Sequence, residues 1–416
     1  MNDEVDSDDL VSRDPRDDDD VHVGGESGAA VNESDAGASD ASGGATAAGP
    51  SPEAKTPAFK YVHSGNLPDL LEHLNITVMA TTFQAGRVLS FSGNRGRCSL
   101  LMRAFAHPMG LAIDAQRMAL VCGNQVVHLV NQTDLVDQEG KRPEYDAYFV
   151  PRRMHVTGDI AGHEAAWGVN PQAGVSSLDY ESDEEIDRLG SLWVVNTRFS
   201  CLATLDQRWS FVPRWRPAFI TKLAPEDRCH LNGMAMEGGR PRYVTMLAPT
   251  DTAQGWRDRK TDGGCVVDIN NNEIVARDMA MPHSPRIYRD RLWVLESGRA
   301  ELQYVDPETG RRHTVTRLPG YVRGLAFYDR FAFVGLSKAR EKRMFGGLPI
   351  EEQKTELQCG IQVVDLDSGK VVAFIQFEAG CEELFDVQVL PNARRANIIG
   401  FTKETVNGIF VLPKKG

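Results

Sequence analysis

Residues 283–310, HSPRIYRDRLWVLESGRAELQYVDPETG, contain the pattern that decides the fold. Two short runs rich in apolar residues, His283–Tyr288 and Leu292–Glu296, are separated by a charged turn. A third run ends at Val305, before the turn Asp306–Gly310. Asp and Gly suit tight turns because Asp bonds to its own main chain and Gly tolerates left-handed backbone. Short apolar runs between such turns predict antiparallel strands rather than helices.

The same unit recurs along the chain. We expect six runs to be the innermost strands of successive units: His107–Asp114, His163–Gly168, His230–Met236, His283–Tyr288, Arg323–Tyr328 and Asp386–Leu390. A second run follows each of them: Met118–Cys122, Leu192–Asn196, Tyr243–Leu247, Leu292–Glu296, Phe331–Leu336 and Ala396–Phe401. Hairpins with Asp at the turn supply the third and fourth strands, as at Val267–Asn272, Val305–Gly310 and Val364–Gly369. Four strands per unit, with units roughly 40–70 residues apart, is the period of propeller blades.

We therefore predict an all-β fold, a six-bladed β-propeller, with seven blades as the alternative. Thr77–Phe105 reads as three further strands, which would complete the last blade and close the ring without a free edge. A jelly roll or a sandwich does not explain the recurring four-part unit. The best short helix candidate is Leu67–Leu74, with Pro68 at its start.

Three insertions interrupt the repeat: Pro171–Gly190, Pro249–Gly264 and Lys338–Gln358. The latter two fall between second and third strands. In a propeller these loops share a face with the beginnings of the inner strands, so we expect them to crowd the mouth of the central channel. Long loops in a compact domain are often lids or binding loops. The alternative is that they are surface insertions that the fold tolerates.

The N-terminal region differs in composition from the rest of the chain. Residues 1–57 are rich in Asp, Glu, Gly, Ala and Ser, and we predict a disordered acidic tail followed by a propeller domain at 58–416. The first 55 residues hold 15 acidic and three basic side chains, a net charge of −12 that equals that of the whole chain. The predicted domain is thus balanced in charge.

Composition also excludes some classes of protein. A balanced domain lacks the basic surplus of nucleic-acid-binding proteins, so we expect no nucleic-acid partner. No apolar run is long enough for a membrane helix, and no secretory signal is visible. The seven cysteines are scattered and lack a C-x-x-C pair, which argues against disulfides and a cysteine zinc site. We expect a cytoplasmic protein; the sequence does not predict its oligomeric state.

Four of the ten histidines stand where predicted inner strands begin: His107, His163, His230 and His283. If the blade register is right, these imidazoles converge near one end of the central channel. Imidazole is the commonest side-chain ligand of transition metals, and several around one point suit Fe, Cu, Mn or Zn. We therefore expect a divalent transition metal held by these four histidines. The alternative is that they only bond to neighbouring backbone and fill a solvated channel.

Charged residues at the same level complete the candidate site. Arg323 and Asp386 begin the two remaining inner strands, and Arg286 follows His283. We expect these three as catalytic residues that orient the substrate or tune the metal, since guanidinium groups pair well with carboxylates and phosphates. Glu164 or Asp386 could also supply an anion near the metal or orient a ligating histidine.

Several segments resemble an uncharacterised conserved-hypothetical family of bacterial β-propeller proteins. They are Leu74–Leu89, His107–Asp114, Asp159–His163, His230–Gly233 and Pro282–Arg286. The resemblance covers about Phe59–Pro413 and implies the propeller architecture without an established reaction. A looser similarity links the chain to metal-dependent propeller enzymes with central His ligands, such as the carotenoid-cleaving oxygenases and some manganese-dependent lyases. That similarity implies only the placement of the histidines, because a fold does not fix a function.

From these features we expect a metal-dependent enzyme with a His-lined site at the propeller centre, an oxidoreductase rather than a lyase. A small molecule or a peptide would be the substrate at the channel mouth. The alternative is a non-catalytic binding module for a peptide or glycan. A third possibility, a scaffold regulated through the acidic tail, rests only on the charge of that tail.

Overall fold

The computed structural model describes residues 59–132, 135, 144–168, 191–338, 346–352, 356–401 and 404–412. The acidic tail expected at 1–57 and the insertion expected at Pro171–Gly190 lie wholly outside these ranges. No helix in the described part of the chain is long and apolar enough to cross a membrane.

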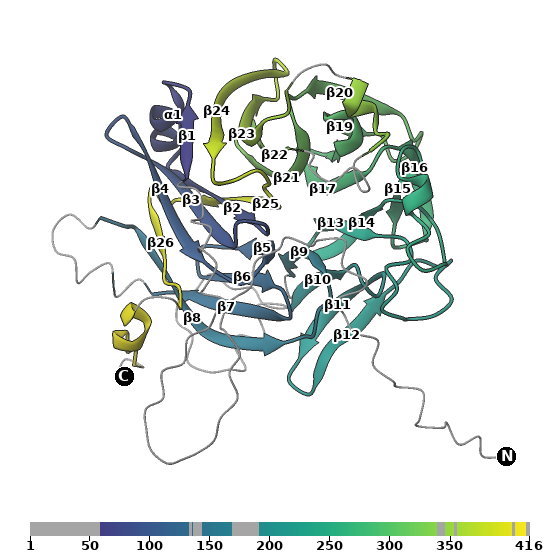
Figure 1. Ribbon diagram of the computed structural model, residues 1–416, viewed down its shortest axis with the longest axis horizontal. Coiled ribbons are helices and arrows are strands. Elements are labelled where there is room, and N and C mark those ends of the chain that lie inside the picture. Colours follow the sequence, from purple (N-terminus) through teal and green to yellow (C-terminus); the bar gives the residue numbers. More distant parts are fainter. Residues whose placement is uncertain are drawn as a thin grey trace, which may run out of the picture. The chain divides into compact units, whose positions relative to one another are not determined.

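Six antiparallel sheets form the blades of a β-propeller, which confirms the predicted architecture and the count of six (Figure 1). Blade I contains β5 (Pro108–Ile113), β6 (Arg117–Cys122), β7 (Gln125–Asn131) and β8 (Ala147–Val156). Blade II contains β9 (Gly162–Trp167), β10 (Leu192–Asn196), β11 (Cys201–Asp206) and β12 (Trp209–Trp215). Blade III contains β13 (Leu231–Glu237), β14 (Arg240–Met246), β15 (Gly264–Asp268) and β16 (Glu273–Met279).

The other three blades follow the same plan. Blade IV contains β17 (Pro282–Tyr288), β18 (Arg291–Glu296), β19 (Glu301–Val305) and β20 (Arg312–Arg317). Blade V contains β21 (Tyr321–Tyr328), β22 (Phe331–Ser337), β23 (Cys359–Asp365) and β24 (Lys370–Ala379), with β1 (Lys60–His63) on its outer edge. Blade VI contains β25 (Asp386–Pro391), β2 (Ile76–Thr82), β3 (Arg87–Asn94) and β4 (Arg97–Ala104). Short 3-10 helices are η2 (Arg257–Arg259), η3 (Ser297–Arg299), η4 (Pro349–Glu352) and η5 (Glu404–Gly408).

Blade VI closes the ring by joining the two ends of the described chain. Strand β25 pairs with β2 from Thr81↔Asp386 to Ile76↔Pro391, so the N-terminal segment supplies three strands, as predicted. The prediction that Ala396–Phe401 is the second strand of this blade is wrong. Strand β2 already occupies that position, and β26 (Ala396–Ile398) instead pairs in parallel with the outer strand β8 of blade I.

Glycines bring the inner strands together in pairs at the channel. Gly110, Gly233 and Gly324, on blades I, III and V, lie against the inner strands of blades II, IV and VI. A Cβ atom on Gly110 would lie 2.7 Å from the Cα of Glu164, and one on Gly324 would lie 2.6 Å from the backbone nitrogen of Val387. Real side chains do not fit at such distances, so this approach requires glycine.

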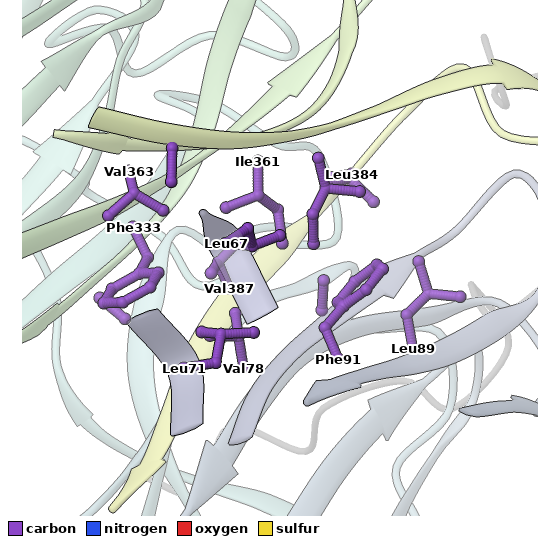
Figure 2. Close-up of a cluster of buried hydrophobic side chains, with 14 of the residues drawn as sticks. Leu67, Leu71, Val78, Leu89, Phe91, Phe333, Ile361, Val363, Leu384 and Val387 are labelled. Carbon is purple, nitrogen blue, oxygen red and sulfur yellow. The ribbon is translucent and has the colours of Figure 1, made fainter. Parts of the chain in front are cut away.

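Apolar side chains fill the spaces between neighbouring blades. The largest cluster lies between blades V and VI, where Phe91 and Phe333 are almost fully buried (Figure 2). Phe377 belongs to the same cluster. Helix α1 (Leu67–Leu74) inserts Leu67 and Leu71 into the same cluster, and Pro68 stands at its start, as predicted. The helix ends at Asn75, whose left-handed backbone (φ 54°) terminates it.

The glycine contacts at the channel predict that adding one methyl group destabilises the protein at Gly233 but not at Gly65. Gly233→Ala places a Cβ atom 2.4 Å from Cδ of Pro285 and 2.6 Å from Oγ1 of Thr245. We expect the free energy of unfolding to fall by about 1–3 kcal/mol, the usual cost of overpacking. Gly65→Ala is the control, because nothing lies within 4 Å of its Cβ position. Urea unfolding of both variants measures the difference, and equal stability of the two would contradict the close approach of blades III and IV.

Candidate functional site

The four candidate histidines occupy two different positions of the repeat. His107 and His230 directly precede β5 and β13, and both have left-handed backbone, with φ of 49° and 48°. His163 and His283 stand two residues further along, as the second residues of β9 and β17. In those blades Ala161 and Met281 take the left-handed position. These four inner strands therefore begin in the same way, but their histidines are equivalent only in pairs.

The structure brings His163 and His230 into contact, with ring centroids 4.7 Å apart and the rings nearly perpendicular. The ring neighbour of His283 is instead Tyr321, at 5.8 Å. His107 is exposed and packs against Phe83 at 4.8 Å. Across the described ranges, no three His, Cys, Asp or Glu side chains are grouped closely enough to hold a metal ion. The predicted four-histidine centre is thus not assembled in this arrangement.

Three of the imidazoles have Nδ1 bound to an acceptor. Nδ1 of His230 lies 2.8 Å from Oδ2 of Asp227. Nδ1 of His163 lies 2.9 Å from both the carbonyl of Ala161 and Oγ1 of Thr197, and this hydroxyl donates its own hydrogen to the carbonyl of Leu231. A hydroxyl that already donates can only accept, so this network assigns the proton of His163 to Nδ1.

His283 is held in the same way. Its Nδ1 lies 3.0 Å from the carbonyl of Met281 and 2.9 Å from Oγ of Ser297, which donates to the carbonyl of Val322. Burial lowers the pKa of both His163 and His283 well below the usual value, and the charge on Arg323 lowers it further. Both rings are therefore neutral at pH 7, with a lone pair on Nε2.

Arg323 lies beside these rings. Its guanidinium carbon is 3.4 Å from the ring centroid of Phe385, and His163 packs on the same phenyl ring at 5.2 Å. Nη1 of Arg323 lies 3.8 Å from Oε1 of Glu383, which is too long for a hydrogen bond. Glu383 was not identified from the sequence, because it stands in the loop before β25 and carries no repeat signal.

Parts of two insertions pack at the same end of the channel. Trp256, from Pro249–Gly264, contacts His230 at a ring distance of 4.4 Å and donates from Nε1 to Oδ2 of Asp227. Leu348 and Ile350, from Lys338–Gln358, are buried in a cluster with Trp256. These buried residues pack beside His230, and residues 339–345 and 353–355 lie outside the described part.

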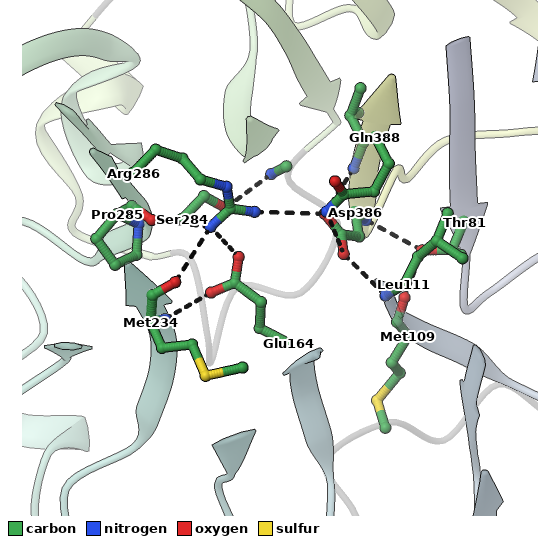
Figure 3. Close-up of polar contacts among 12 residues, drawn as sticks. Thr81, Met109, Leu111, Glu164, Met234, Ser284, Pro285, Arg286, Asp386 and Gln388 are labelled. Atoms are coloured by element: carbon green, nitrogen blue, oxygen red, sulfur yellow. Dashed lines mark hydrogen bonds and ion pairs between the residues drawn. The ribbon is translucent and has the colours of Figure 1, made fainter. Parts of the chain in front are cut away.

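Deeper in the channel, Arg286 joins two carboxylates from other blades (Figure 3). Its Nη1 forms an ion pair with Glu164 of blade II, and its Nη2 lies 3.9 Å from Oδ1 of Asp386 of blade VI. Burial raises the pKa of Glu164 to about 7, and the nearby Arg286 counteracts this rise. Burial also raises the pKa of Asp386, again against the effect of Arg286.

The two carboxylates also bind backbone of the next blade. Oε2 of Glu164 accepts from the N–H of Met234 at 2.6 Å, and Oδ2 of Asp386 accepts from the N–H of Leu111 at 2.9 Å. Met234 and Leu111 directly follow the channel glycines of blades III and I. Arg286 follows Met281 by five residues, and at this place of the repeat four other inner strands have Ala112, Ala166, Ala235 and Ala326. An arginine at a place where four other inner strands have alanine is the sequence signal for a side chain that crosses the channel.

The ion pairs of Arg286 predict a pH-dependent loss of stability. A raised carboxyl pKa means that folding becomes less favourable as the pH rises from the unfolded pKa, about 4.3 for Glu, to the folded one. Arg286→Met removes the cation and raises the folded pKa of Glu164 further, so the loss continues above pH 7. We expect the variant to lose about 3–5 kcal/mol at pH 8, and less at pH 6.

Thermal and urea unfolding at both pH values measure this effect. Arg289→Met is the matched control, because Arg289 is 45% exposed and its ion pairs are 3.6 Å long. A loss for Arg286→Met that is no larger than for the control, or that does not grow with pH, would contradict the buried network.

Comparison with curated proteins finds no match. Among solved structures, a chain from the crystal structure of a nidogen/laminin complex aligns with 76% of this chain and 98% of its own length, with 11% identity and a TM-score of 0.43. A similarity this low gives no information about function. The profile of the family described as domain of unknown function DUF4915 matches residues 65–399, which include all six inner strands. The chain therefore belongs to the DUF4915 family of proteins of unknown function.

Proposed function

We propose that the channel mouth is the active site of an enzyme that acts on a small molecule by general acid–base catalysis, with His230 as the base. The observation that carries this proposal is the contact between Nδ1 of His230 and Oδ2 of Asp227, 2.8 Å long. A carboxylate in this position fixes the tautomer and stabilises the imidazolium that forms when Nε2 accepts a proton.

The surroundings of the pair support this role. Oδ2 of Asp227 also accepts from Trp256, whose indole packs on the imidazole, so both partners of the pair are held in place. Neutral His163 also contacts His230 and adds no positive charge that would oppose its protonation. Arg323 supplies the cation that could hold an anionic substrate.

The predicted roles of Arg286 and Asp386 change in this proposal. Arg286 contacts the carboxylates of Glu164 and Asp386, and Asp386 accepts from the backbone of Leu111, so we assign both residues to holding the channel wall beneath the site rather than to touching the substrate. Arg323 keeps its predicted substrate-orienting role. We also keep the cytoplasm as the proposed compartment, on the strength of the cysteine usage in the sequence.

A substrate screen tests the proposal. Full-length protein is incubated with small hydroxyl compounds, esters and lactones, and turnover is followed by NMR. We expect His230→Gln to lower the turnover of any active compound by about 10²–10⁴-fold, with a comparable loss in Asp227→Asn, because the base or its orientation is lost. His73→Gln, on the exposed end of α1, is the control and should retain full turnover.

Two results would contradict the proposal. One is full turnover in His230→Gln, which would exclude His230 as the base. The other is a screen in which compounds bind but none is turned over, which would favour the non-catalytic binding module.

A metal-dependent oxidoreductase is the second candidate function. One observation favours it: histidines that bind metals usually donate from the other ring nitrogen to a carboxylate, carbonyl or water, as His163, His230 and His283 do here. Their Nε2 atoms would hold the Fe, Cu, Mn or Zn. Against it stands the spread of the three rings and the fixed charge of Arg323 among them.

Elemental analysis of the purified protein decides between the two candidates. Stoichiometric Fe, Cu, Mn or Zn that is lost in both His163→Gln and His230→Gln would establish the metal centre. Metal-free protein with the same melting temperature in chelator would exclude it and leave the acid–base proposal in place.

A further inference from the structure

The guanidinium of Arg323 has few polar partners at the mouth. Its side chain is only 16% exposed, yet within the described residues it makes no hydrogen bond. Its contacts there are the face of Phe385 and the 3.8 Å ion pair with Glu383. A guanidinium has five N–H donors, and buried donors are normally satisfied. The donors of Arg323 are thus free to bind an acceptor that enters the mouth.

Free acceptors lie next to these free donors. His163 and His283 are neutral and have Nδ1 engaged, so Nε2 of each carries a lone pair that can accept from a donor, and Nδ1 of His230 is engaged in the same way by Asp227. The charge of Arg323 acts on both His163 and His283, and Arg323 and His163 pack on the same phenyl ring. A matching ligand therefore needs an anionic acceptor and a hydrogen-bond donor within one small molecule.

We propose that the site binds a small hydroxy-carboxylate. The carboxylate accepts from the guanidinium of Arg323, and a hydroxyl group donates to Nε2 of His163 or His230. This inference rests on the proposed function and names its substrate class, since a hydroxyl that donates to Nε2 of His230 is the group from which that residue takes a proton. A planar carboxylate fits the fork of a guanidinium, which can donate two parallel bonds.

Charge favours a carboxylate over a phosphate. Arg323 is accompanied by Glu383, and the carboxyl groups of Asp386 and Glu164 lie near enough to affect its pKa. The histidines at the mouth that face it, His163 and His283, are neutral and supply no further positive charge. A singly charged carboxylate therefore meets less repulsion from these carboxyl groups than a phosphate dianion does.

Four probes test the substrate class, three of which share a three-carbon skeleton. Glycerate carries both groups, propionate only the carboxylate and glycerol only the hydroxyls, and inorganic phosphate is the competing anion. Kd values come from ligand-observed NMR titrations of the full-length protein. We expect glycerate to bind about tenfold or more tightly than glycerol and phosphate, and about two- to tenfold more tightly than propionate, because a charged hydrogen bond contributes more than a neutral one.

Variants assign the two halves of the ligand. Arg323→Gln should weaken glycerate binding about tenfold or more, and Arg323→Lys should weaken it less, because an ammonium keeps the charge without the fork. His163→Phe should reduce the preference for glycerate over propionate while propionate binding stays unchanged. Arg289→Gln, an exposed arginine, is the control with unchanged binding. Circular dichroism melts of each variant establish that it is folded.

Equal affinity for glycerate and propionate, tighter binding of phosphate, or unchanged binding in Arg323→Gln would overturn the inference. The proposed function can be rejected independently of this inference. If binding depends on Arg323 but His230→Gln keeps full turnover, His230 is not the base and the proposed substrate class is retained. If turnover depends on His230 but glycerate is not preferred, only the proposed substrate class is rejected.

Discussion

The close approach of the inner strands at the channel is the constraint on which the rest of the structure depends. Three glycines allow blades I and II, III and IV, and V and VI to touch backbone to backbone. Glu164 and Asp386 then reach across to N–H groups of the next blade, and Arg286 balances their charge. These contacts fix the inner strands relative to one another, and they thereby position the side chains at the mouth.

The repeat was predictable because propeller blades are nearly independent units with the same local pattern. The inner strands, the turn residues and the closure of blade VI by Thr77–Phe105 all followed from it. The C-terminal run Ala396–Phe401 was misplaced because its apolar pattern is the same whether it pairs inside a blade or along an outer edge. Only the pairing of β25 with β2 excludes it from blade VI.

The site was predictable only in part. Repeat position placed His163, His230, His283 and Arg323 at one end of the channel. It could not show that a shift of two residues separates His107 and His230 from His163 and His283. Asp227, Thr197 and Ser297, which set the tautomers, lie in loops at the ends of strands, where no period marks them. The chemistry of the mouth thus depends on residues without a sequence signal.

The protonation of the three imidazoles is the central claim, because the base, the ligand contacts and the metal alternative all require a free Nε2 lone pair. Long-range ¹H–¹⁵N correlation NMR of protein labelled at histidine reports the tautomer of each ring directly. For His163 and His283 at neutral pH, we predict a proton on Nδ1 and none on Nε2, and for His230 a proton on Nδ1. A proton on Nε2 of His163 or His283, or none on Nδ1 of His230, would contradict the account.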